Sequence, residues 1–185
     1  MKTLWSSLIQ PHLDYCCQLW CPCDQQSISK LESLLRHFTA KISGCEGQNY
    51  WERLKSLNIL SQERRRERSR IILIWKILQG YVDGYSLEHS NSDRRGRTIV
   101  VPSYPARAAA PVRNAKESSL RVHGAKIFNV MPKYLRDAQC SVSSFKRQLD
   151  EWLMNIPDQP TIPDCQRAAK TNSLVDQVAF ATNNE

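Results

Sequence analysis

Arginines are the residues of this sequence whose type and spacing point most directly to a chemical role. A guanidinium presents a planar fork of N–H donors that matches the oxygens of a phosphate group. Such contacts hold a nucleic-acid backbone without reading its base sequence. We therefore expect nucleic-acid-binding residues in two clusters, which comprise Arg64, Arg65, Arg66, Arg68 and Arg70, and Arg94, Arg95 and Arg97.

The positive charge of the chain is concentrated in the same regions. The 185 residues include 26 Lys and Arg against 18 Asp and Glu, which gives a net charge of +8. Residues 61–70 and 93–126 together hold +9, so the remainder is nearly neutral. Uneven positive charge is the electrostatic footprint of a nucleic-acid partner, although a solvated basic surface without a partner would give the same count.

The carboxylates form no catalytic pattern. Nucleotidyl transfer uses two metal ions held by neighbouring carboxylates, which polymerases usually carry as adjacent aspartates on a hairpin. This sequence has no Asp-Asp pair and no Asp-x-Asp, and its four histidines lie far apart. The Gly-rich phosphate loop, His-Glu-x-x-His and Gly-x-Ser-x-Gly are also absent from the sequence. We therefore expect no catalytic residue, no cofactor and no enzymatic activity of the chain on its own.

A cluster of cysteines is the place in the sequence where a metal could bind. Cys16, Cys17, Cys21 and Cys23 follow His12, and four thiolates can hold zinc in a tetrahedron. The spacing is unfavourable, because structural zinc sites favour two Cys-x(2–4)-Cys knuckles separated by a loop. Cysteine is also common as a small buried residue, so we expect no metal site.

Cysteine usage and hydropathy indicate an intracellular protein, in the nucleus or the cytoplasm. Seven cysteines is an odd number, whereas a secreted disulfide framework usually has an even, spread set. The longest unbroken apolar run, Ile71 to Trp75, is far shorter than a membrane-spanning helix requires. The sequence thus predicts free thiols and no membrane partner.

Apolar residues recur at spacings of three and four along much of the chain, which predicts a mainly α fold, a small thumb-like helical bundle. We expect N-caps at Ser27 or Ser29 for a helix that reaches Ile42, and at Ser141 or Ser143 for one that reaches Ile156. We also expect a kinked helix or two short helices around Pro11, and a short helix through Trp51 and Leu57. The core is predicted to include Trp5, Leu34, Phe38, Trp75 and Trp152.

The helix expected over residues 61–80, with Ser61 as its N-cap, changes character along its length. Its second half carries an apolar stripe, and its first half carries the first arginine cluster. One interpretation is that the apolar half lies in a core while the arginines grip phosphate oxygens. The other is that the arginines pair with Glu63 and Glu67 at helical spacing on a solvated face.

The chain is expected to divide into four segments. Residues 1–82 form the thumb-like helical region, and residues 117–156 form a C-terminal helical extension. Glycine, proline and arginine in residues 83–116 predict a long irregular basic linker, which is either functional or disordered. Residues 157–185 are expected to form a loosely packed polar tail.

The order of several motifs along the chain carries a resemblance to a known family. The sequence runs SLIQPHLDYCCQLWCP, KLESLLRHFTAKISG and YWERLKSLNILSQERRRERSRIILIWKILQG, then SLRVHGAKIFNVMPKYLR, SVSSFKRQLDEWLMNIPDQPTIP and RAAKTNSLVDQV. This succession resembles the region that follows the catalytic palm in jockey-like non-LTR retrotransposon (LINE) reverse transcriptases. The resemblance covers nearly all of residues 4–178.

The resemblance implies a thumb and C-terminal extension without a polymerase active site. The palm of these RNA-directed DNA polymerases carries an aromatic-Ala-Asp-Asp motif, which this sequence lacks. It implies a non-catalytic fragment that binds the backbone of a primer–template RNA/DNA duplex, with the palm and fingers of a parent enzyme as possible partners. The alternative is a decayed, translated element remnant that acts at most as a helical protein-interaction domain.

Overall fold

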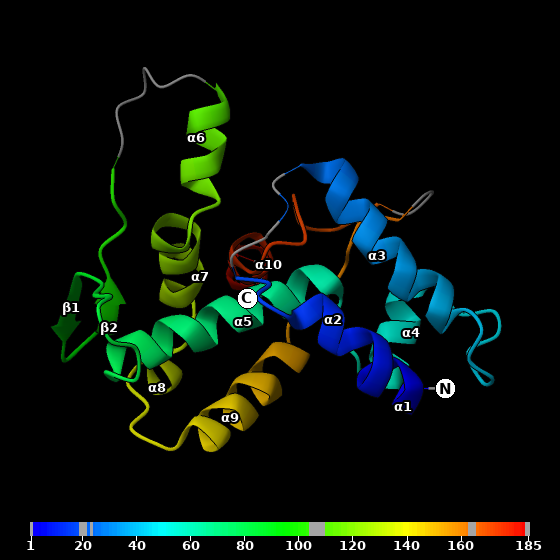
Figure 1. The fold of residues 1–185 in the computed structure, drawn as a ribbon, viewed down its shortest axis with the longest axis horizontal. Coiled ribbons are helices and arrows are strands. Elements are labelled where there is room, and N and C mark those ends of the chain that lie inside the picture. Colours follow the sequence, from blue (N-terminus) through cyan, green and yellow to red (C-terminus); the bar gives the residue numbers. More distant parts are fainter. Residues whose placement is uncertain (1, 19–21, 23, 104–109, 163–165, 184–185) are drawn as a thin grey trace. The chain divides into compact units, whose positions relative to one another are not determined.

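The computed structural model describes residues 2–18, 22, 24–103, 110–162 and 166–183, and these divide into two compact units. The first unit is Met1–Arg66 with Ile156–Glu185, and the second is Glu67–Asn155. Both are built mainly from helices (Figure 1), which confirms the predicted fold class.

The first unit contains only helical elements among its described residues. They are α1 (Lys2–Leu4), the π-helical turn η1 (Trp5–Ile9), α2 (Gln10–Asp14), α3 (Gln25–Thr39), α4 (Tyr50–Leu57), the start of α5 (Gln62–Leu78) and α10 (Leu174–Thr182). The second unit holds the rest of α5 and one antiparallel hairpin. Its further elements are β1 (His89–Ser92), β2 (Gly96–Ile99), α6 (Ala110–Glu117), the π-helical turn η2 (Leu120–Gly124), α7 (Ala125–Asn129), α8 (Lys133–Arg136) and α9 (Val142–Met154).

The core of the first unit forms where α3 and α4 pack against the N-terminal helices. Its buried cluster includes Trp5, Leu35 and Leu54, and the ring of Phe38 lies 4.9 Å from that of Trp5. Leu34, which was expected in the core, is 50% exposed. The buried face of α3 passes through its neighbour Leu35, so the expectation was wrong by one position.

Side-chain caps fix where three of the helices begin. Ser61 and Ser141 cap α5 and α9 as predicted, since their hydroxyls accept the N–H groups three residues on, at 3.1 and 3.2 Å. Asp24, rather than Ser27 or Ser29, caps α3. Its carboxylate accepts the N–H of Ser27 at 2.8 Å, which satisfies a backbone donor that the helix leaves unpaired.

The described residues after Pro157 pack into the first unit instead of forming a loose tail. Ile162, Ala169 and Leu174 are buried, and Asn172 is 1% exposed. The indole N–H of Trp51 donates to the carbonyl of Pro160 at 2.8 Å. These scattered apolar and amide side chains are too few to show a period, yet they attach the described part of the segment to the first unit.

The core of the second unit centres on the apolar half of α5. Trp75 is fully buried and stacks on Phe145 of α9, with ring centroids 4.4 Å apart and planes at 9°. Figure 1 shows α9 running alongside this part of α5. Gly124 faces the same helix, since a Cβ at this position would lie 2.6 Å from Cδ1 of Ile74. The expected apolar stripe of α5 is thus buried.

Residues 83–116 are more regular than the sequence indicated. They contain the hairpin and α6, while residues 104–109 lie outside the described part. Strand β2 ends at Ile99. Strand β1 is exposed along its whole length and so lacks the alternation that would have revealed it. Among the described residues, no helix has the length and apolar character needed to cross a membrane.

Candidate nucleic-acid interface

The arginines at the start of α5 are engaged within the first unit. Arg64 is fully buried, and its Nη2 donates to the carbonyls of Pro157 at 3.0 Å and Asn172 at 3.2 Å. Arg65 forms a two-pronged ion pair with Asp14, through Nε at 2.9 Å and Nη2 at 2.7 Å. The guanidinium of Arg66, a residue only 7% exposed, donates back to a carbonyl of its own helix. Arg64 and Arg65 therefore hold this end of α5 against other segments of the first unit.

The two further arginines of this cluster belong to the second unit and are engaged there. Arg68 forms a two-pronged ion pair with Asp150 of α9, with Nη2 at 2.8 Å from Oδ2. Arg70 is 6% exposed and donates to the carbonyl of Ser118 at 3.0 Å. Its Nη1 lies 2.7 Å from Nδ1 of His123.

His123 is held as a neutral acceptor by this arginine. Burial, with Arg70 and Lys126 nearby, lowers the pKa of His123 to about 4. A guanidinium has only donors, so the Nδ1 that faces Arg70 must accept. The remaining N–H sits on Nε2, which lies 3.9 Å from Glu67, too far for a hydrogen bond. His123 therefore gives Arg70 an acceptor in a partly buried contact.

These contacts alter the role expected for the first arginine cluster. Arg64, Arg66 and Arg70 are buried. Arg65 and Arg68 each form a bidentate ion pair with a carboxylate. In this structure the arginines at this end of α5 contact protein groups, so the interpretation that they grip phosphate oxygens stays a prediction that these contacts do not favour. The reason is that carbonyls and carboxylates from distant segments reach the helix, which sequence spacing alone does not show.

The second arginine cluster lies on the hairpin and is far more open. Arg94 and Arg95 are exposed in the turn that joins β1 to β2, whereas Arg97 is half-buried within β2. Gly96 follows the turn with φ of +72°, a left-handed conformation typical of a three-residue hairpin loop. The hairpin thus presents two neighbouring cations at its tip.

Helix α8 and the end of α7 hold this hairpin in place. Arg136 is buried and donates to the carbonyls of Arg95 and Arg97, both at 2.7 Å. Asp137 accepts the N–H of Arg97 at 2.7 Å. Asn129 pairs with both backbone groups of Ile99 at 2.8 Å, as a neighbouring strand would. These hydrogen bonds hold the backbone of the hairpin and so fix the position of its tip.

The exposed cations near the hairpin extend over the elements that pack beside it. Strand β2 contacts α7 and α8, and α7 follows η2, which contacts α6. Further exposed cations on these elements are Arg113, Arg121, Lys126 and Lys133. The second unit contains 15 Lys and Arg against 8 Asp and Glu, a net +7, whereas the first unit has a net charge of only +1.

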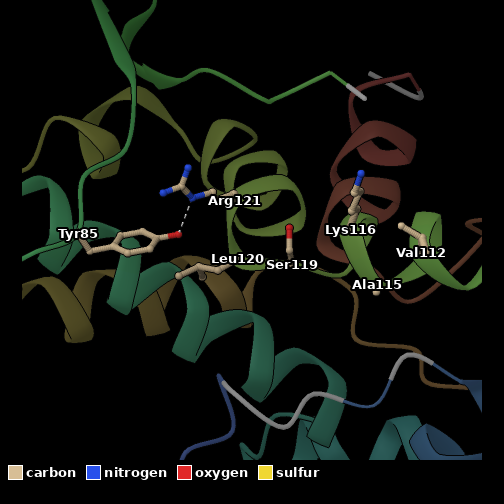
Figure 2. Close-up of a pocket in the computed structure, with 7 residues that line it drawn as sticks. All are labelled: Tyr85, Val112, Ala115, Lys116, Ser119, Leu120 and Arg121. Atoms are coloured by element: carbon tan, nitrogen blue, oxygen red, sulfur yellow. Dashed lines mark hydrogen bonds between the residues drawn. The ribbon is translucent and has the colours of Figure 1, made fainter. Parts of the chain in front are cut away.

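A pocket opens between α6, η2 and the loop after α5 (Figure 2). Its volume is ≈ 480 Å³, and its lining combines polar and apolar groups that include Tyr85, Lys116, Ser119, Leu120 and Arg121. The guanidinium carbon of Arg121 lies 5.2 Å from the centre of the Tyr85 ring, and Nε donates to the phenolic oxygen at 3.1 Å. A second pocket of ≈ 280 Å³ also has Arg121 in its wall.

The cysteine cluster shows no metal geometry in the part that can be described. Cys16 and Cys17 are free thiols, half-buried and buried respectively, while Cys21 and Cys23 lie outside the described residues. Within the described ranges, no group of three or more His, Cys, Asp or Glu side chains is placed to hold a metal ion.

Sequence reasoning missed several residues that matter here. Tyr85 carries no local signal, because a single tyrosine in a loop belongs to no pattern. Lys116 and Arg121 fall inside the basic stretch of residues 93–126 but not inside a run of arginines. Arg136 is indistinguishable in sequence from a surface arginine, and only the fold shows that it supports the hairpin.

The comparisons with known proteins add no relative. No family model, no curated protein and no solved structure matches this sequence.

Proposed function

We propose that this chain is the non-catalytic, nucleic-acid-binding part of a retrotransposon RNA-directed DNA polymerase. Its second unit holds the phosphate backbone of a primer–template duplex, and the chemical step belongs to a palm whose Asp-Asp motif this sequence lacks. The single observation that carries the proposal is the segregation of charge, with +7 on the second unit and +1 on the first. The order of sequence motifs supplies the assignment to the element family.

The hairpin tip is the centre of the proposed interface. Arg94 and Arg95 are exposed, adjacent and anchored through their backbone, so little conformational freedom is lost when they meet a phosphate strand. The arginines of α5 have a different role in this proposal. They hold the helix in each unit and contribute no direct phosphate contact.

The test is the salt dependence of duplex binding, measured by fluorescence anisotropy with a labelled RNA/DNA primer–template. The slope of log K against log salt is negative, and each phosphate contact that is lost reduces its magnitude by about 0.9 for a duplex. The variant Arg94→Ala/Arg95→Ala is expected to bind more weakly and to reduce that slope by about 1–2. Its matched control is Lys41→Ala/Lys55→Ala, which removes the same charge from exposed positions of the first unit.

The proposal fails if the wild-type chain binds no duplex, or if the control variant loses as much affinity as the hairpin variant. The second of these results would mean that net charge alone governs binding. A chain that ignores polyanions would instead favour the helical protein-interaction role. The exposed Leu4 and Leu8 of the N-terminal helices, 52% and 61% accessible, would then be the first surface to examine.

A further inference from the structure

We propose that the pocket between Tyr85 and Lys116 takes an unpaired nucleotide of the bound nucleic acid, so that the protein prefers a duplex with a single-stranded extension to a blunt duplex. This inference rests on the proposed function and names the part of the ligand that enters this site. Its aromatic and apolar side chains, Tyr85, Val112 and Leu120, are not part of the duplex-backbone interface.

The pocket combines the three kinds of group that a nucleotide needs. Lys116 and Arg121 supply positive charge for a phosphate, and Ser119 supplies a hydroxyl. Tyr85 supplies an aromatic ring, and Val112 and Leu120 supply apolar walls. Figure 2 shows these side chains distributed around one hollow, with Tyr85 at one end and Lys116 towards the other. Aromatic rings interleaved with cations are the usual platform for single-stranded nucleic acid.

The contact between Arg121 and Tyr85 organises one end of the pocket. The guanidinium lies over the ring at 5.2 Å and donates from Nε to its oxygen at 3.1 Å. That bond fixes the Nε edge of the guanidinium against the phenol, so the two groups hold each other in place. The ring and the guanidinium plane both offer flat surfaces on which a base can stack.

The neighbouring pocket indicates at which end of the site the phosphate of the nucleotide binds. Arg121 also lines this second hollow, whose other walls include Glu88, Val100 and Pro102. The carboxylate of Glu88 disfavours a phosphate there, so the phosphate belongs at the Lys116 end of the larger pocket. The volume of the larger pocket, ≈ 480 Å³, falls within the range of small-ligand sites.

The shape of the site favours an unpaired nucleotide over a paired one. In a duplex the bases are stacked and paired, and a protein reaches mainly their edges and the backbone. A concave site with an aromatic wall can accept a base only after it has left the stack, which costs least where the strand is already single. A primer–template junction provides such a strand beside the duplex.

The experiment compares two labelled RNA/DNA duplexes of identical paired sequence, one blunt and one with a short single-stranded extension, with the full chain in fluorescence anisotropy. Loss of base–aromatic stacking corresponds to about fivefold or more in affinity. Wild type is therefore expected to prefer the extended duplex by about fivefold or more. Tyr85→Ala should remove that preference and leave blunt-duplex affinity unchanged, while Tyr85→Phe should keep most of it.

Two controls keep the comparison specific. Tyr134→Ala removes a tyrosine that is 61% exposed on α8, outside the pocket, and should keep the wild-type preference. If Tyr85→Ala does not fold, as judged by its circular dichroism and Tm, the wild-type chain is crosslinked to an extension that contains thiouridine. Mass spectrometry should then find the crosslink on the peptides that carry Tyr85 or Arg121.

Four outcomes overturn the inference. Equal affinity for the two duplexes would do so while leaving the proposed function intact. A preference that persists in both Tyr85→Ala and Arg121→Ala, or a crosslink that maps only outside the pocket, would do the same. Failure to bind either duplex would overturn the proposed function and, with it, this inference.

Discussion

The Nη2 of Arg64 lies 3.0 Å from the carbonyl oxygen of Pro157, a residue 93 positions further along the chain. The same nitrogen donates to the carbonyl of Asn172 at 3.2 Å. One guanidinium therefore ties the start of α5 to two points of the C-terminal segment. Around it lie the carboxyl groups of Glu63 and Asp158, whose side chains both accept from the amide of Asn172 at 3.0 Å.

The first prediction concerns this buried guanidinium. Arg64→Ala leaves two carbonyls without their donor and opens a cavity, so the first unit should lose about 2–4 kcal/mol of stability. Urea denaturation followed by circular dichroism measures the loss, and hydrogen exchange should localise it to α10 and the segment before it. Arg95→Ala, at the exposed hairpin tip, should change stability by no more than about 0.5 kcal/mol. Equal stability of the two variants would contradict the assigned role of Arg64.

The contrast between these arginines shows what the sequence could and could not predict. Helical periodicity located α5 and its cap at Ser61, because the buried stripe and the capping residue are local features. It could not separate Arg64 from Arg95, because burial depends on which distant carbonyls reach the helix. The cluster near residue 64 matches a phosphate-binding pattern in sequence, yet its partners are supplied by Asp14, Pro157 and Asp150.

The hairpin escaped prediction for a related reason. Strand β1 is exposed along its length, so its side chains alternate neither in polarity nor in burial. Its place in the fold comes from β2, from the buried Arg136 and from Asn129, which both bond to the backbone of β2. Backbone pairing of this kind leaves no trace in side-chain pattern. The net charge of the region was predictable, but the surface that presents it was not.

The second prediction tests how closely the hairpin is fitted to α8. A Cβ at Gly96 would lie 2.5 Å from Oδ2 of Asp137 and 2.8 Å from Cγ of Lys133. Asp137 cannot withdraw without losing the N–H of Arg97. Gly96→Ala should therefore lower the Tm, and it should also weaken duplex binding because the tip moves.

Gly84 provides the matched control for this substitution. It has the same φ of +72°, and a Cβ at this position would meet no heavy atom within 4 Å. Gly84→Ala thus carries only the backbone strain of about 1 kcal/mol. The difference between the two Tm shifts isolates the contact with Asp137 and Lys133. If the two variants melt at the same temperature, the hairpin is not packed as described.

The third prediction concerns Glu32, which is buried in the first unit. Its carboxyl group accepts from the hydroxyl of Tyr50 and from the N–H of Gln62 at 2.9 Å. Burial raises the pKa of Glu32 from 4.5 to about 8. A raised pKa means that the folded state binds the proton more tightly than the unfolded state, so its contribution is complete below pH 4.5 and is lost as pH rises towards 8.

Glu32→Gln should remove this dependence, because an amide does not titrate over that range. Thermal melts of wild type between pH 4.5 and 8 should show the first unit weakening as pH rises, and the variant should show a flatter profile. Glu151→Gln, at an exposed position of α9, serves as the control and should keep the wild-type slope. A Glu32→Gln profile as steep as that of wild type would place the titration elsewhere.

The fourth prediction has the opposite sign and belongs to the second unit. The pKa of His123 falls from 6.5 to about 4 because the ring is buried and faces Arg70. A depressed pKa means that the unfolded state takes up the proton first, so stability is complete above pH 6.5 and declines as pH falls towards 4. The decline should be on the order of 1–3 kcal/mol.

His123→Gln retains an acceptor for Arg70 without a titrating ring and should abolish this decline in stability. His89→Gln, on the exposed strand β1, should keep the decline. Hydrogen exchange at several pH values, resolved by segment, should therefore show α7 and the second half of α5 loosening in acid while α3 and α4 tighten. Uniform loosening of both units in acid would contradict the assignment of these two side chains.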